Sequence, residues 1–265
     1  MRFGHLTLDD GLSQSNVLSI LQDSDGMMWF GTENGLNGFD GYEFNHYKRE
    51  RGNPEALIND FIFDIAEDDK GALWLATNGG GLAKLDRASG RVKTYRHDTA
   101  NPASIAGNII RRLLIDEAGF IWIGTRGAGL DRFDPRTETF RHFELTADDS
   151  SGTVFALLQD SAGVLWVGGD HGVTRIDKHD FSTQTIASEA AGPASIGPHS
   201  VRAIVEDSDG QLWIGTYGGG LSRLSAENNT FEHFVHDEND TTTISSDRVT
   251  SLFEDSDGRL WAGTA

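Results

Sequence analysis

The stretch that decides the fold reads DSDGQLWIGT and occupies residues 207–216. It opens with Asp207, has Gly210 three residues later and reaches Trp213 three residues after that. An Asp side chain can accept hydrogen bonds within a tight turn, and Gly can adopt the positive φ that such a turn requires. The first four residues therefore predict a hairpin turn, and the apolar residues on either side of Trp213 predict the strand that leaves it.

The same motif occurs six times and includes every Trp of the chain, with neighbouring tryptophans 44 to 48 residues apart. A β-branched residue stands twelve positions before each Trp and an aliphatic residue stands nine positions before it. This nearly continuous apolar run is typical of a strand covered on both faces. Two further short segments follow in each complete copy, so each repeat predicts four strands. The tryptophans are Trp29, Trp74, Trp122, Trp166, Trp213 and Trp261.

A period of this length with four strands and a Trp signature is typical of a β-propeller. A helical solenoid would show a period of about 3.6 residues, and none is present. We predict an all-β chain of four-stranded antiparallel blades, with five complete blades and a partial sixth, forming one incomplete propeller domain over residues 1–265. Residues 1–8 resemble a fourth-strand stretch and are expected to supply the outer strand of a closing blade. The predicted blades are 12–47, 57–97, 104–144, 150–186, 196–236 and, as the partial one, 243–265.

The composition removes several classes of function. The 265 residues include 41 acidic and 22 basic ones and carry a formal net charge of -19, which disfavours nucleic acid and anionic membranes as partners. Cysteine is absent, so no thiolate nucleophile or Cys-ligated zinc is available. No run approaches the roughly 18 apolar residues of a spanning helix, and the first residues lack the apolar segment of a signal peptide. We expect no membrane contact by this segment.

The repeated polar residues do not form a catalytic or metal-binding motif. The Asp-x-Asp-Gly stretches lack the later oxygen ligands and the Glu of an EF-hand loop, so they are interpreted as turns. His5, His142 and His233 occupy matching outer-strand positions, which favours a structural role. The Gly-Gly-Gly runs at 79–81 and 218–220 lack the Lys-Ser/Thr of a phosphate loop. We therefore predict no catalytic residue, no cofactor and no metal.

Binding residues are expected where the copies differ from one another. Arg111 and Arg112 replace apolar or small residues in an innermost strand, and Arg202 repeats the first of these changes. A guanidinium near a channel suits a carboxylate or sulfate, although pairing with the chain's own Asp and Glu is the alternative interpretation. The loops between second and third strands also vary. The full set of candidate ligand-binding residues is Asn78, Arg111, Arg112, Arg126, His171, Arg202 and Tyr217.

The chain resembles the repeats of two-component regulator propellers. The resemblance begins with DDGLS at residues 9–13, continues through 17–23 and 28–32 to GLNGFDG at 35–41, and returns in the later Leu-Trp-Ile-Gly-Thr copies. It implies the periplasmic sensor region of a bacterial hybrid histidine kinase or diguanylate cyclase receptor. In that family two seven-bladed propellers, a β-sandwich and a membrane helix usually precede a cytoplasmic output domain, so this chain is expected to be a fragment of a seven-bladed ring.

The resemblance implies a ligand-sensing module that recognises an oligosaccharide or another small extracellular ligand and is not itself an enzyme. It also implies contact with downstream domains of the same receptor as a homodimer. Two alternatives stay open at this point. One is a propeller enzyme, such as a lyase or hydrolase acting on a polysaccharide or lactone. The other is a scaffold that binds protein partners.

Overall fold

The computed structural model describes residues 4–143, 145, 152–170, 172–187, 195–196, 199–225 and 230–265. In this part of the chain every regular element is a β-strand. The strands form five antiparallel sheets of four strands and one of two, each ordered along the sequence. None of the described residues forms a helix that is long and apolar enough to cross a bilayer. The predicted all-β fold, with five complete blades and a partial sixth, is confirmed.

Two compact units divide the chain. Unit one comprises Met1–Arg126 and Leu130–Phe143, and unit two comprises Gly127–Gly129 and Glu144–Ala265. Each unit contains three consecutive sheets. That the whole chain is a single domain, and that it belongs to a seven-bladed ring, stays a prediction.

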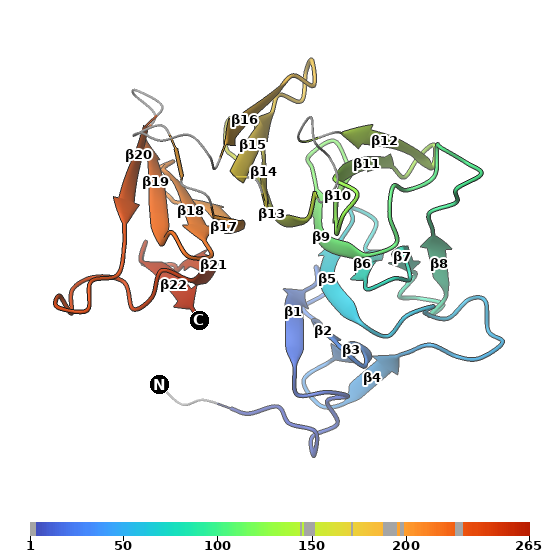
Figure 1. Ribbon diagram of the computed structural model, residues 1–265. Coiled ribbons are helices and arrows are strands. Elements are labelled where there is room, and N and C mark those ends of the chain that lie inside the picture. Colours follow the sequence, from blue (N-terminus) through green and yellow to red (C-terminus); the bar gives the residue numbers. More distant parts are fainter. Residues whose placement is uncertain are drawn as a thin grey trace. The chain divides into compact units, whose positions relative to one another are not determined.

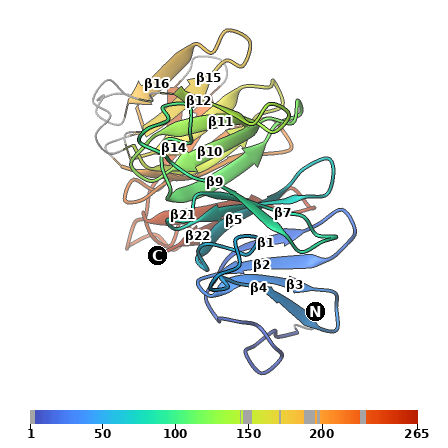
Figure 2. The same ribbon diagram turned by 90° about the vertical axis from the view of Figure 1, so that its right-hand side faces the viewer.

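The three sheets of unit one each begin with a strand of six residues. The first consists of β1 (Val17–Gln22), β2 (Met28–Thr32), β3 (Gly35–Phe39) and β4 (Phe44–Tyr47). The second consists of β5 (Ile62–Glu67), β6 (Leu73–Thr77), β7 (Leu82–Leu85) and β8 (Val92–Tyr95). The third consists of β9 (Ile110–Ile115), β10 (Ile121–Thr125), β11 (Leu130–Asp134) and β12 (Thr139–Phe143). The first strands of these neighbouring sheets, β1, β5 and β9, lie side by side (Figures 1 and 2).

Unit two repeats this order and ends with a two-stranded sheet. Its first sheet consists of β13 (Val154–Gln159), β14 (Leu165–Gly169), β15 (Gly172–Ile176) and β16 (Thr183–Ala187). Its second consists of β17 (Val201–Glu206), β18 (Leu212–Thr216), β19 (Leu221–Ser225) and β20 (Thr230–Phe234). Its third consists of β21 (Val249–Glu254) and β22 (Leu260–Thr264).

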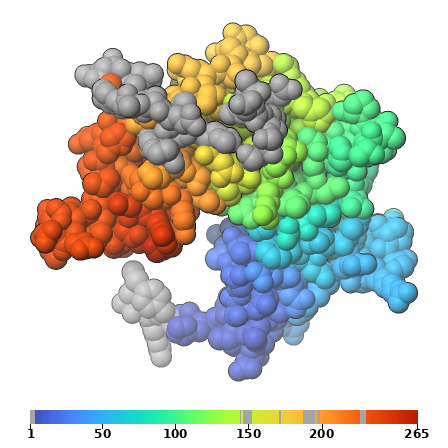
Figure 3. Space-filling model, in the orientation of Figure 1, coloured from blue at the N-terminus to red at the C-terminus, as the bar shows by residue number. Residues whose placement is uncertain are grey.

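The Trp of one sheet packs against the first strand of the next. Trp29 shares a buried cluster with Ile62 and Ile65, the residues twelve and nine positions before the following Trp. The register of β5 shifts between Ile62 and Asp64, and this bulge lets two residues three positions apart enter the same core. The space-filling view shows the first and second sheets of unit one in direct contact (Figure 3). The same packing recurs at Trp74 with Ile110 and Leu113, and at Trp166 with Val201 and Ile204.

The aspartate six residues before each Trp has two tasks. One oxygen of Asp23 accepts the backbone N–H groups of Asp25 and Met27, which closes the turn, and Gly26 adopts a φ of 89°. The other oxygen accepts the indole Nε1–H of Trp29 at 2.7 Å. All six copies make this second bond, at 2.7 to 2.9 Å. The predicted turn role is correct, and the fixed spacing also reflects a hydrogen bond that orients each Trp in its core.

A second polar contact joins neighbouring sheets at the same turns. The Ser after the turn aspartate donates both its N–H and its hydroxyl to a Glu near the end of the next sheet's first strand, at 2.6 to 2.8 Å. Where either residue changes, as at Asp69 and Ile115, this pair of bonds cannot form. The three pairs are Ser24 with Glu67, Ser161 with Glu206, and Ser208 with Glu254.

Residues 4–8, the described part of the N-terminal segment 1–8, contain no strand. Residues 4–7 have no regular structure, and Thr7 begins a turn in which its N–H and hydroxyl donate to Asp10. An outer strand needs a third strand to pair with, and the sheet of β21 and β22 contains none. The assignment of this segment to a closing blade therefore stays a prediction.

Candidate ligand-binding surfaces

Four of the candidate residues in unit one meet at one end of two sheets, where the first strand begins and the second strand ends. Arg111 and Arg112 lie on β9. Asn78 follows β6 and forms a bridge to Ile109, and the Arg126 N–H donates to the Ile109 carbonyl at 2.8 Å. Backbone pairing thus brings these four residues to the same end of the two sheets.

Arg112 lies in the field of a carboxylate from the neighbouring sheet. Asp64 occupies the equivalent position of β5, and burial raises its pKa, while Arg112 and the N–H groups of Leu113 and Ile65, each at 3.0 Å, oppose that rise. An Arg112 side chain also donates to the Arg111 carbonyl at 3.2 Å. The arrangement agrees with the interpretation that Arg112 is matched by the chain's own acid.

Arg111 stacks on an aromatic ring of the neighbouring sheet. Its guanidinium carbon lies 4.3 Å from the ring centroid of Phe63, which holds the same position in the preceding repeat. Phe61 packs beside Phe63 at 4.6 Å between centroids. The sequence reasoning singled out Arg111 but did not include Phe63, although the alternation of Phe and Arg at matching positions was visible.

Unit two contains the same pairing and extends it. The guanidinium of Arg202, on β17, lies 3.6 Å from the ring of Phe155 on β13 and 5.2 Å from that of Tyr217, which follows β18. The guanidinium of Arg248 also lies 5.4 Å from the centroid of the Tyr217 ring. Phe155 and Arg248 were not among the predicted site residues. The predicted His171 lies outside the described residues.

The electrostatics of Arg202 differ from those of Arg112. Burial lowers the pKa of Arg202, and only Asp170 and the Tyr217 hydroxyl counteract it. Neither oxygen-bearing group is within ion-pair distance of Arg202 in the described structure. The guanidinium stays a cation at any physiological pH. It is therefore a partly desolvated positive charge in a strongly acidic protein.

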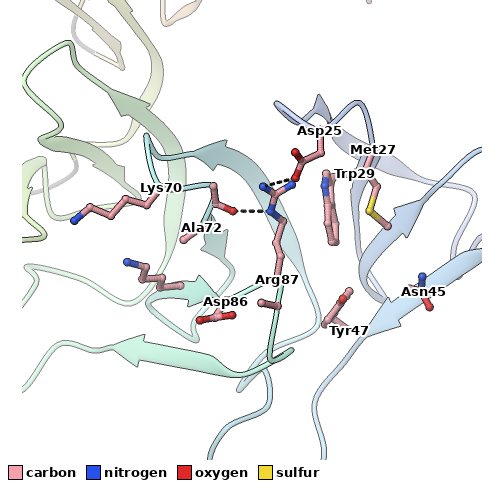
Figure 4. A pocket seen from close by; sticks show the side chains of 12 residues that line it. Asp25, Met27, Trp29, Asn45, Tyr47, Lys70, Ala72, Asp86 and Arg87 are labelled. Atoms are coloured by element: carbon pink, nitrogen blue, oxygen red, sulfur yellow. Dashed lines mark hydrogen bonds and ion pairs between the residues drawn. The ribbon is translucent and has the colours of Figure 1, made fainter.

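A cleft of about 750 Å³ lies between the first two sheets of unit one and is lined by Trp29, Tyr47 and Arg87 among others (Figure 4). Arg87 follows β7 and reaches across to the turn of the first sheet. It donates to the Gly71 carbonyl at 2.6 Å and forms ion pairs with Asp25 at 3.0 Å and Glu67 at 3.1 Å.

The buried Asp23 is a further acceptor of the Arg87 guanidinium. Four acceptors of the protein thus occupy the Arg87 donors. The Arg87 cation is used to join two sheets and is not available to a ligand in the cleft.

Two of the three histidines expected to have a structural role have polar partners, whereas His5 lies in a stretch without regular structure. His142 contacts Asp131 at 2.6 Å and the Pro102 carbonyl at 3.0 Å, and His233 contacts the Ser222 hydroxyl at 3.0 Å. Among the residues that the structure describes, no three His, Asp or Glu side chains are grouped as metal ligands.

Repeated four-stranded antiparallel sheets, packed face to face through a Trp, define a β-propeller protein. The family model described as two component regulator propeller matches six segments of the chain, at residues 11–34, 56–79, 104–127, 148–171, 195–218 and 243–265. The chain belongs to this family. Each matched segment begins shortly before the first strand of a sheet and ends just after its second strand. It therefore contains the turn and the Trp that recur in every sheet.

Solved structures with a similar fold come from several functional classes. The extracellular domain of a protein described as a hybrid two component system from B. thetaiotaomicron is 22% identical, with a TM-score of 0.58 over 98% of this chain and 40% of that one. PorZ, described as a surface component of the type-IX secretion system of Porphyromonas gingivalis, is 19% identical, with a TM-score of 0.69 over 94% of this chain and 37% of that one. Virginiamycin B lyase from Staphylococcus aureus is 16% identical, with a TM-score of 0.71 over 96% and 79%. At these identities the likeness concerns the fold alone.

A curated relative covers a shorter stretch. Histidine kinase P4 of Formosa agariphila is 53% identical over 53 residues, which are 20% of this chain and 4% of the kinase. The chain thus spans a small part of that kinase and about two fifths of the B. thetaiotaomicron ectodomain.

Proposed function

We propose that the chain is the ligand-sensing propeller of an extracytoplasmic bacterial receptor, coupled to a histidine kinase or diguanylate cyclase output, and that it recognises an oligosaccharide. The observation that carries this proposal is the match of six successive repeats to the two component regulator propeller family. Under this proposal the chain lies in the periplasm, works as part of a homodimer and transmits binding to other domains of the same receptor.

Support also comes from the distribution of the variable residues. The repeated Asp, Gly and Trp are used within and between sheets, whereas Arg202 and Tyr217 depart from the repeat and lie at a partly exposed end of their sheets. In a repeat protein such positions are free to vary with the ligand.

The test is a calorimetric screen of the purified chain against neutral, uronic and sulfated oligosaccharides, followed by a reporter assay in cells carrying the full receptor. We expect saturable binding of one glycan class and induction of the reporter by that class alone. Failure of every glycan in the screen would contradict the oligosaccharide part of the proposal.

The likeness to virginiamycin B lyase keeps an enzyme as the second candidate. The same screen separates the two, because an enzyme would convert its glycan or lactone during the titration and a sensor would return it unchanged. Product analysis by mass spectrometry after overnight incubation gives the readout. Turnover that tracks the purified chain would replace the sensor proposal, and pull-down of a protein partner with no glycan binding would favour a scaffold.

A further inference from the structure

The strongest unused feature of the molecule is the group of charged and aromatic side chains at one end of unit two. We propose that Arg202, Tyr217 and Arg248 form a binding site for the carboxylate or sulfate group of an acidic oligosaccharide. The inference rests on the proposed function for the oligosaccharide and names its chemical class.

Backbone pairing fixes the three residues beside one another. Tyr217 donates its N–H to the Ser200 carbonyl at 2.9 Å and forms an antiparallel bridge to Arg248. Arg202 follows Ser200 by two residues and anchors its Nε to the Ser200 hydroxyl at 3.1 Å. Both guanidinium groups lie over the ring of Tyr217, that of Arg202 at 5.2 Å and that of Arg248 at 5.4 Å from its centroid.

Both arginines retain donors for a ligand. Apart from its bond to Ser200, the Arg202 guanidinium has only ring contacts in the part of the chain that the structure describes, and Arg248 has only the contact with the Tyr217 ring. Elsewhere in unit two the exposed arginines behave differently, because Arg223 pairs with Glu232 and Arg259 with Asp257. Among the described arginines of unit two, Arg202 and Arg248 thus share with Arg175 the lack of an ion pair, and they are the two that lie against the Tyr217 ring.

Arg202 matches Arg111 of unit one, which packs on Phe63 as Arg202 packs on Phe155. There, Asp64 faces Arg112 from the neighbouring first strand. The two matching positions in unit two are Ala156 and Ala203. Unit two thus lacks both members of this pair, and the carboxylate whose charge acts on Arg202 is that of Asp170, which forms no ion pair with it in the described structure.

The chemistry of the group selects an acidic sugar. A guanidinium offers a planar pair of N–H donors that matches a carboxylate or a sulfate, and partial burial strengthens such charge-assisted bonds. Tyr217 is 41% exposed and presents an aromatic face beside these donors. An aromatic surface with a few polar groups is typical of small-ligand sites. A uronate or a sulfated sugar contains both an apolar ring face and the anion.

The experiment uses the purified chain and isothermal titration calorimetry with three probes of similar size: trigalacturonate, a sulfated galactose trisaccharide and neutral galactotriose. We expect one of the two acidic probes to bind and the neutral one to bind at least tenfold more weakly. Binding should weaken as NaCl is raised, because salt screens exposed charges. The acidic probe that binds distinguishes a carboxylate from a sulfate ligand.

Variants then assign the binding to this site. Arg202→Gln and Arg248→Gln are each expected to weaken binding about tenfold or more, since each removes a charge-assisted contact. Arg202→Lys keeps the charge but loses the planar pair of N–H donors, so its affinity should lie between those of the wild type and Arg202→Gln. Arg259→Gln is the matched control, because it removes the same charge from another exposed surface of unit two. Circular dichroism confirms that each variant is folded.

The outcomes separate the site from the proposed function. Equal binding of neutral and acidic probes, or acidic binding that the Arg202 and Arg248 variants leave unchanged, would overturn the site and leave a glycan sensor in place. Titration with free galacturonate and sulfate adds the converse case. Suppose that these ions bind, that the Arg202 and Arg248 variants abolish this binding, and that no oligosaccharide binds. The anion site would then be supported and the oligosaccharide sensor contradicted. If neither the ions nor the acidic probes bind, the site is overturned.

Discussion

Replacing Arg87 by Met is expected to lower the free energy of unfolding by about 2–3 kcal/mol. Arg87 joins the first two sheets of unit one through three carboxylates, and its own side chain is 19% exposed. The contact with Asp25 adds little, because that side chain is 78% exposed. The main loss comes from Asp23, which is fully buried, and Glu67, which is 14% exposed.

Breaking a buried ion pair commonly costs about 3–5 kcal/mol, because one charge is left without its partner. We expect a value below that range, since Asp23 keeps the Trp29 indole at 2.7 Å and the N–H groups of Asp25 and Met27. The matched control is Arg91→Met. Arg91 lies in the same connection but is 69% exposed, and its partner Glu55 is 55% exposed, so the expected loss is about 0.5 kcal/mol.

Urea unfolding followed by Trp fluorescence measures both variants. A double-mutant cycle with Asp23→Asn isolates the coupling between the two charged groups. If Arg87→Met and Arg91→Met lose the same stability, or if the cycle gives no coupling, the reasoning about the buried carboxylate is wrong.

The pH dependence provides a separate test of the same pair. Burial alone would raise the pKa of Asp23, but hydrogen bonds from Trp29 and Met27 and the charge of Arg87 hold it below its ordinary value of 3.8. A carboxyl whose folded-state pKa is lowered stabilises the fold above pH 3.8 and loses that contribution as the pH falls through the folded-state value. The difference between wild type and Arg87→Met should therefore shrink below about pH 3.8. A difference that stays constant down to pH 2 would contradict this assignment.

Three further predictions concern the repeat. Gly81→Ala should lower the free energy of unfolding by about 2–3 kcal/mol, because at a φ of 87° a Cβ would lie 2.2 Å from the Tyr95 carbonyl oxygen. The control Gly79→Ala has a φ of 100° but open space around the Cβ, and should cost about 1 kcal/mol. Equal losses of the two variants in thermal melts would refute the clash. Glu206→Gln should lower the free energy of unfolding by about 1 kcal/mol, because it weakens two hydrogen bonds from Ser161. Urea denaturation tests this against the exposed control Glu232→Gln, which should lose less. Burial disfavours the charged form of His142, but Asp131 at 2.6 Å and the Pro102 carbonyl outweigh burial and raise the pKa of His142 above 6.5. The wild type should therefore lose stability as the pH rises from 6.5 through that raised pKa. His142→Gln should flatten this loss and the exposed-site variant His179→Gln should not.

The repeat was predictable from sequence because its signals are local. The turn, the Trp and the two upstream apolar positions lie within twelve residues of one another, so their spacing is fixed by one hairpin. Contacts between sheets are not encoded in this way. Arg87 meets Asp23 across 64 residues, and no other copy has an Arg at the position of Arg87. Because Arg87 occurs in one copy alone, a search for repeated residues does not reveal it.

The candidate site could be predicted from the sequence only in part. Arg111 and Arg202 were found because they break the repeat, yet their partners Phe63 and Phe155 were missed because Phe fits an apolar pattern. Comparing the same position in consecutive copies would have revealed both pairs, since neighbouring sheets place equivalent residues side by side. The same comparison one position later gives Asp64 and Arg112 in unit one but two alanines in unit two. Charge matching between consecutive repeats thus identifies the oppositely charged pair of Asp64 and Arg112, which unit two does not repeat.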